Sequence, residues 1–197
     1  MRTTSLHLRP FDDRPGSTLE LRAGAVHLGD LVEFEFLLSG SATDLSRVVW
    51  PETKSPAERG RRDELWKATC LELFLGDAHS TSYLEMNVSP TGDWNLYAFD
   101  DYRKGMRCTS GEVALHASPK SGEPYFRLVG AIRRQDAEKS GELVRLLGSR
   151  ELVFGATAVL EYQTGEREYW ALSHAGEKPD FHLRASFTAR LSRPGFK

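Results

Sequence analysis

Aromatic and acidic side chains occur together in this sequence in the combination that suits the recognition of a sugar. Sugars present flat patches of C–H bonds on which aromatic faces stack, while nearby Glu, Asn and Arg side chains hydrogen-bond the hydroxyl groups. Trp66 and Trp170 lie near the ends of two expected strands. They indicate a site for a small saccharide or a similar cyclic polar ligand. A place in the core is the alternative for any tryptophan, above all for Trp50 and Trp94.

Strand alternation predicts that two glutamates share a polar and aromatic face. In residues 69–75 the leucines occupy alternate positions, so Glu72 points to the opposite side. In residues 83–89 the apolar residues also alternate, which places Glu85 and Asn87 away from the core. We therefore expect the leucine faces to form the core and the glutamate faces to form a binding surface. Ordinary exposed strand carboxylates are the alternative interpretation.

Short β-rich runs separated by turn residues make up most of the chain and predict an all-β fold. About ten strands, in one domain spanning residues 1–197, favour an antiparallel β-sandwich of the jelly-roll or immunoglobulin-like kind. A helix is expected over residues 135–147, interrupted by Ser140 and Gly141. The expected strands cover residues 18–21, 31–38, 48–50, 68–75, 83–88, 94–99, 112–116, 125–132, 152–162, 168–172 and 186–191.

Composition and charge exclude several classes of protein. The 197 residues carry 26 basic and 28 acidic side chains, a net charge of −2. This balance argues against nucleic-acid binding and against a polybasic membrane anchor. The apolar runs are far shorter than the roughly 20 residues that span a bilayer. The first ten residues lack the apolar core of a secretion signal, so we expect a cytoplasmic protein.

The two cysteines, Cys70 and Cys108, match no metal-binding or redox spacing. We expect both to be reduced thiols, with a disulfide between them as the less favoured alternative. The residues Asp63, His79 and His116 show no spacing typical of a metal site either. The pair Asp100 and Asp101 is too short for a calcium loop, so no metal and no cofactor is expected.

Three longer motifs resemble a known family. They are WKATCLELF at residues 66–74, YLEMNVSPTGDWNLYAF at residues 83–99, and YWALSH at residues 169–174, followed by KPDFH at residues 178–182. Together they resemble DOMON-like proteins related to family 9 carbohydrate-binding modules, in particular the DOMON-like group associated with a UDP-N-acetylmuramate dehydrogenase. The resemblance covers residues 31–191 and implies an antiparallel β-sandwich that binds a ligand without catalysis.

The resemblance also implies roles for individual residues. Family 9 modules clamp a terminal sugar between two tryptophans, and Trp66 and Trp170 occupy the matching places. An acidic residue six positions after the first tryptophan bonds the sugar hydroxyls, and Glu72 fits that spacing. Nearness to the same strands adds further candidate contacts, although no motif match supports them. These are Asn87, Tyr97, Arg103 and His174; for His174 a loop hydrogen bond is the alternative.

Three other functions remain open. Some DOMON domains bind haem through methionine and histidine, and Met86, Met106, His174 and His182 are available, although Met86 lies on an apolar strand face. Glu72 and Glu85 could form the carboxylate pair of a glycoside hydrolase. An interaction or scaffold domain is the third alternative. Motifs of serine hydrolases, zinc proteases and nucleotide-binding proteins do not occur in the sequence.

Overall fold

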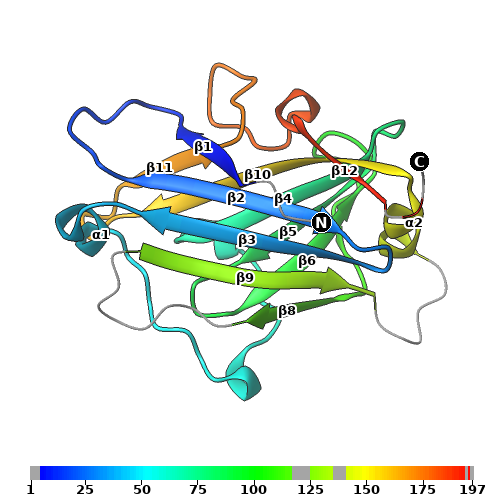
Figure 1. The fold of residues 1–197 in the computed structure, drawn as a ribbon, viewed down its shortest axis with the longest axis horizontal. Helices are drawn as coiled ribbons and strands as arrows, with labels where there is room; N and C mark the ends of the chain where they lie inside the picture. The colour runs from blue at the N-terminus through cyan, green and yellow to red at the C-terminus, as the bar shows by residue number, and fades with distance from the viewer. Residues whose placement is uncertain (1–4, 117–124, 135–140, 194, 196–197) are drawn as a thin grey trace.

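The computed structural model describes residues 5–116, 125–134, 141–193 and 195, and within these it is an antiparallel all-β fold (Figure 1). Two short α-helices are also described, α1 (Ala42–Arg47) and α2 (Glu142–Gly148), and neither is long and apolar enough to cross a membrane. The described strands are β1 (Leu6–Pro10), β2 (Glu20–His27), β3 (Leu31–Ser39), β4 (Cys70–Asp77), β5 (Tyr83–Val88), β6 (Trp94–Phe99), β7 (Arg107–Cys108), β8 (Glu112–His116), β9 (Tyr125–Arg133), β10 (Glu151–Glu161), β11 (Arg167–Ala171) and β12 (Ala189–Ser192).

The strands form two layers that face each other (Figure 1). One layer has the order β7–β6–β5–β4–β10–β11, with β12 also paired to β10, and the other has the order β2–β3–β9–β8. Strand β1 joins the layers, because Leu6 to Leu8 pair with β2 while Arg9 and Pro10 pair with β11. The predicted antiparallel sandwich is therefore confirmed, as one sheet folded over on itself.

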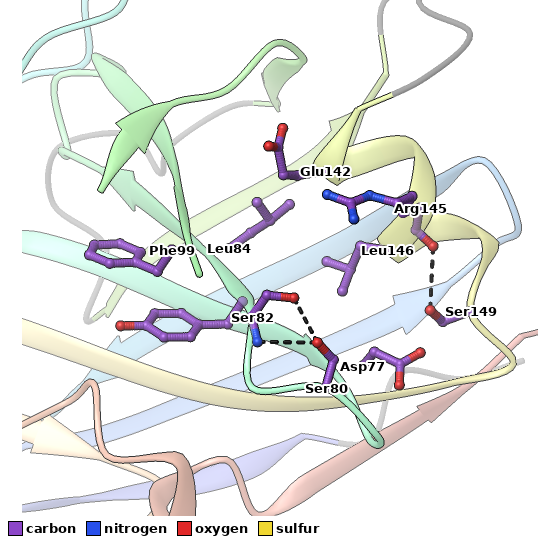
Figure 2. Close-up of a pocket in the computed structure, with 10 residues that line it drawn as sticks. Asp77, Ser80, Ser82, Leu84, Phe99, Glu142, Arg145, Leu146 and Ser149 are labelled. Atoms are coloured by element: carbon purple, nitrogen blue, oxygen red, sulfur yellow. Dashed lines mark hydrogen bonds between the residues drawn. The ribbon is translucent and has the colours of Figure 1, made fainter. Parts of the chain in front are cut away.

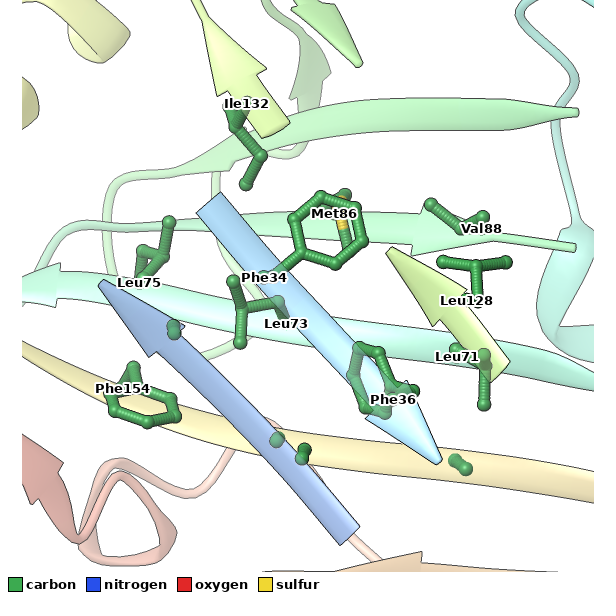
Figure 3. Packing of buried hydrophobic residues seen from close by; sticks show 14 of the residues in the cluster. Phe34, Phe36, Leu71, Leu73, Leu75, Met86, Val88, Leu128, Ile132 and Phe154 are labelled. Atoms are coloured by element: carbon green, nitrogen blue, oxygen red, sulfur yellow. The ribbon is translucent and has the colours of Figure 1, made fainter. Parts of the chain in front are cut away.

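The core lies between the layers and is built from alternate positions of the strands. Phe34 and Phe36 of β3 meet Leu71 and Leu73 of β4 there, and all four side chains are buried (Figure 3). Burying one such side chain contributes roughly 1.5–3 kcal/mol. The leucine face of β4 is thus the core face, as the alternation predicts. Met86 of β5 is fully buried in the same core.

Several expected elements differ from the structure at their boundaries. The expected strand at residues 48–50 is an isolated bridge between Val48 and Tyr162, and β1 and β7 were not predicted. The expected strand at residues 186–191 begins only at Ala189, because a 3₁₀ turn occupies Arg184–Ser186. Of the expected helix at 135–147, residues 142–147 fall in α2, while residues 135–140 lie outside the described residues.

Candidate functional site

A pocket of about 380 Å³ lies on the face of the β4–β5 layer that points away from the core. Strands β4, β5, β10 and β11 form its floor, and loops at residues 64–67, 100–106 and 179–182 form its walls. It is open to solvent and combines aromatic with ionisable side chains. The lining residues are Trp66, Glu72, Glu85, Phe99, Arg103, Met106, Val159, Arg167, Tyr169, Pro179, Phe181 and His182.

Strand register brings the two floor carboxylates together. Glu72 of β4 pairs with Asn87 of β5, and Phe74 pairs with Glu85. Glu72 and Glu85 are therefore diagonal neighbours on one face of the sheet, within reach of each other's charge. Both are nearly fully buried, at 3% and 4% exposure, so neither is an ordinary exposed strand carboxylate.

Glu72 is a buried acid with little to stabilise its charge. Thr157 Oγ1 of β10 donates a hydrogen bond to Glu72 Oε2 at 3.0 Å. Burial, and then the charge of Glu85, raise the pKa of Glu72 to about 8, against the smaller opposing effects of Thr157 and Arg103. Burial, and then the charges of Glu72 and Glu85, raise the pKa of the nearby Cys70 thiol, so that buried cysteine is unreactive.

Glu85 has a polar partner on each side. Asn87 Nδ2 donates to Glu85 Oε1 at 2.6 Å, and His182 Nε2 lies 3.7 Å from Glu85 Oε2. Burial raises the pKa of Glu85 to about 7, although Asn87 and Arg103 oppose the shift. Near neutral pH the two glutamates therefore hold about one proton between them, and they titrate as a pair.

A chain of hydrogen bonds orients the His182 ring. The backbone N–H of Arg103 donates to Tyr83 Oη at 3.3 Å, and Tyr83 Oη lies 2.8 Å from His182 Nδ1. Donation of the phenol proton to Nδ1 satisfies both groups and leaves the imidazole proton on Nε2, on the side of Glu85. Burial, and then the charge of Arg103, lower the pKa of His182 to about 4, so the ring is neutral at pH 7.

Trp66 is held at the pocket wall by a network behind it. It lies in a 3₁₀ turn, Leu65–Lys67, and its half-buried ring meets the Tyr97 ring edge to face at 5.9 Å. Tyr97 Oη donates to Asp63 Oδ1 at 2.8 Å, and Asn95 Nδ2 donates to the same oxygen at 2.8 Å. Tyr97 is therefore a positioning residue behind Trp66 and does not line the pocket.

Two loops are joined across the rim by Asp180. Arg103 Nη2 donates to Asp180 Oδ1 at 2.9 Å, and Tyr102 Oη donates to Asp180 Oδ2 at 2.6 Å. Burial opposes ionisation of Asp180, but these two hydrogen bonds outweigh it and lower its pKa. Arg103 also has a positive φ of 53°, so the loop makes a tight left-handed turn at the rim.

The expected pairing of Trp66 with Trp170 across one mouth is wrong. Trp170 is 4% exposed, lies in the main core, and donates its Nε1 proton to Glu168 Oε2 at 2.9 Å. Its neighbour Tyr169 points to the other face of β11 and lines the pocket instead. The register explains this, since Tyr169 pairs with the pocket residue Val159 and Trp170 pairs with the core residue Ala158.

The other predicted candidates take different places. Arg103 lines the pocket at its rim, and Asn87 lies beneath it as a fully buried partner of Glu85. His174 does not line the pocket; its Nε2 lies 2.9 Å from the Arg9 carbonyl oxygen, and its ring meets Phe11 edge to face. For His174 the structure thus shows the loop hydrogen bond that was the alternative interpretation.

Sequence reasoning missed several pocket residues. Phe181 and His182 belong to the motif at residues 178–182, and the sequence alone gives neither of them a place in the saccharide site. Phe99 ends β6 and, two residues after Tyr97, lies on the same face of that strand. Tyr169 could not be chosen over Trp170 by alternation, because each face of β11 carries one charged and one aromatic residue.

A second, smaller pocket of about 200 Å³ lies between α2 and the β5–β6 edge (Figure 2). Its polar groups already bond one another: Ser149 Oγ donates to the Arg145 carbonyl oxygen, and the Ser80 and Ser82 hydroxyls lie 2.8 Å apart. Glu142 at its edge is paired with Arg107 at 2.6 Å. This pocket therefore offers few groups to a ligand.

The residues that the sequence offered as metal or haem ligands do not lie together in one site. Met86 lies in the core, whereas Met106 is 48% exposed at the pocket rim, and His182 bonds Tyr83. In the part of the chain that the structure describes, no three His, Cys, Asp or Glu side chains are grouped to hold a metal ion. Cys70 and Cys108 are free thiols, the first buried and the second exposed.

Comparison with known proteins supports the fold. No protein-family model and no curated protein matches the chain. Among solved structures, the chain is similar to a Bacteroides uniformis protein described as a "putative carbohydrate-binding protein", with a TM-score of 0.54 and 15% sequence identity. The match covers 95% of this chain and 86% of that one. At this identity the likeness establishes a shared architecture, and the ligand must be argued from the site.

Proposed function

We propose that the protein is a non-catalytic saccharide-binding domain whose ligand lies in the outer-face pocket over Glu72 and Glu85. The observation that carries this proposal is the joining of aromatic walls to two buried carboxyl groups within one open pocket of about 380 Å³. The name of the similar Bacteroides uniformis structure, which refers to carbohydrate binding, supports it. So does the resemblance to DOMON-like proteins related to family 9 modules, to which we propose the chain is related.

The pocket supplies each part of a sugar contact. Trp66 and Tyr169 offer aromatic surface to the C–H patches of a pyranose ring. Glu72 and Glu85 accept hydrogen bonds from hydroxyl groups, and Arg103 can donate one from the rim. The carboxyl groups are already desolvated in the free protein, and near neutral pH they share about one proton. The ionised group is therefore a strong acceptor for a hydroxyl at little further cost, and the protonated one can donate.

The test is titration calorimetry with monosaccharides and short oligosaccharides against the wild type and Trp66→Ala. We expect binding by the wild type and at least a tenfold loss in Trp66→Ala, which corresponds to about 1.4 kcal/mol. Tyr125→Ala is the matched control, because this half-buried tyrosine lies on β9 in the other layer. Unchanged affinity in Trp66→Ala, or an equal loss in Tyr125→Ala, would contradict the site.

Glycoside hydrolysis is the second candidate, favoured by the raised pKa of both glutamates. A glycosidase needs one carboxyl group that stays protonated near neutral pH as the general acid, and burial provides this for Glu72. Turnover of chromogenic glycosides that disappears in Glu72→Gln would establish an enzyme. Saccharide binding without turnover in the wild type would leave the binding domain as the function.

A further inference from the structure

The buried glutamates of the pocket lack a permanent positive partner. Among the described residues, no Lys or Arg nitrogen forms an ion pair with Glu72 or Glu85. The nearest basic group to Glu85 is the neutral His182 at 3.7 Å. A buried carboxylate is costly unless a charge or several hydrogen bonds compensate it. The floor of the pocket is therefore a place where a positive charge would be stabilised.

Two arginines line the pocket: Arg167, which forms no ion pair with Glu72 or Glu85 among the described residues, and Arg103, which is committed elsewhere. Arg103 gives its guanidinium to Asp180 at 2.9 Å, and Asp180 is held in turn by Tyr102 at 2.6 Å. Moving Arg103 to the floor would break this ion pair and leave the partly buried Asp180 without its positive partner. The fold thus keeps the cation on the wall and the two acids below it.

The walls also favour a cation. Trp66 and Phe181 on the walls and Tyr169 on the floor line the pocket with aromatic rings, and the negative faces of such rings attract ammonium groups. Aromatic surface alone would suit many apolar ligands, and carboxyl groups alone would suit any hydroxyl. The two together match a polar ring that bears a positive charge.

We propose that the ligand is an amino sugar with a free ammonium group, which sits over Glu72 and Glu85. This inference rests on the proposed saccharide function and narrows it to a substrate class. The ammonium donates hydrogen bonds to both carboxylates, and the ring stacks on Trp66. Because a positive charge favours the ionised form of both acids, the proton that they hold near neutral pH leaves on binding.

The experiment compares matched sugars by calorimetry at pH 7. Glucose, glucosamine and N-acetylglucosamine form one set, and the corresponding galactose and mannose sets are run alongside. In at least one set, we expect the free amine to bind tenfold or more tightly than both its parent sugar and its N-acetyl form. Repeating the titration in buffers of different ionisation enthalpy should reveal proton release with the amine only.

Variants of Glu72 and Glu85 test whether these two residues cause the preference for the amino sugar. Glu72→Gln and Glu85→Gln should each reduce the preference for the amine, whereas Glu33→Gln, an exposed site on β3, should keep it. Equal binding of parent and amino sugars would overturn this inference and leave the saccharide proposal standing. A preference that survives in both pocket variants would also overturn it. Absence of binding by every sugar in the panel would overturn both proposals.

Discussion

Tyr169 and Trp170 are consecutive residues of β11 that lie on opposite faces of the sheet. Tyr169 lines the outer pocket, while Trp170 is buried in the core and bonded to Glu168. Tyr162 Oη donates to the same carboxylate at 2.5 Å, so Glu168 serves as a shared buried acceptor. One strand thus separates an aromatic ring that lines the pocket from one that packs in the core.

Replacing Trp170 by alanine should affect stability, whereas replacing Tyr169 should affect ligand binding. We expect Trp170→Ala to lower the free energy of unfolding by about 3–5 kcal/mol, because it leaves a large cavity in the core. Tyr169→Ala should change that free energy by less than about 1 kcal/mol, since the ring is only half buried, but should weaken saccharide binding. Urea unfolding with calorimetry checks both. A stable Trp170→Ala together with a strongly destabilised Tyr169→Ala would reverse the assignment of faces.

The stability of the protein should depend on pH through the floor glutamates. Their pKa values, about 8 and about 7, lie above the usual 4.5, so the folded state binds more protons than the unfolded state in that range. Their contribution to stability is therefore fully present below about pH 4.5 and is lost progressively as the pH rises through 7 to 8. The lowered pKa of His182 has the opposite effect, but only below about pH 6.5. We expect the free energy of unfolding to fall between pH 6.5 and pH 8.

Glu72→Gln should flatten this dependence. At pH 8 the variant should be more stable than the wild type by on the order of 1–3 kcal/mol, because it no longer buries a charge. Thermal or urea unfolding at pH 6.5, 7.2 and 8 measures the slope, with Glu33→Gln as the exposed control. An unchanged slope in Glu72→Gln would mean that Glu72 is not a buried acid in solution.

Tyr97→Phe should show how firmly Trp66 is held from behind. The change keeps the ring that contacts Trp66 and removes the hydrogen bond to Asp63. We expect the free energy of unfolding to fall by about 1 kcal/mol, the usual contribution of such a bond. Tyr125→Phe on the other layer is the control and should have no effect. Equal stability of Tyr97→Phe and wild type would show that Asn95 alone holds the Asp63 carboxylate.

Asp180→Asn should loosen the rim of the pocket. The substitution removes the charge that holds Arg103 and weakens the hydrogen bond from Tyr102. We expect trypsin to cut faster after Arg103 or Lys104 in this variant, by several-fold under native conditions. Mass spectrometry of a short digest gives the cleavage sites. Asp12→Asn, in the exposed loop after β1, is the control, and equal cleavage in both variants would contradict the role of Asp180.

Most of the fold was predictable because alternation in this chain is strong. In β4 and β5 the core face is uniformly apolar, so the outward direction of Glu72, Glu85 and Asn87 follows from the sequence alone. Boundaries were harder to predict. Strand β1 has only five residues and ends in Pro10, and the run at residues 48–50 has the composition of a strand but finds only one bridge partner.

The site was predictable only where a single strand determined it. Burial of both glutamates depends on loops distant in sequence, since Phe181 and His182 close over β4 and β5 from residues nearly a hundred positions away. No local pattern indicates that contact. Likewise, Glu72 shares the pocket with Trp66, as the six-residue spacing led us to expect, but spacing alone could not indicate which face of β11 carries Trp170.

Removal of strand β1 by proteolysis should expose an unpaired edge on each of two strands. The five residues of β1 complete two separate ladders, with β2 through Leu6 to Leu8 and with β11 through Arg9 and Pro10. Proteolytic loss of this segment would leave backbone donors and acceptors unsatisfied on two strands at once. Such exposed edges recruit strands from other molecules. A clipped chain should therefore self-associate into aggregates even while its core remains packed.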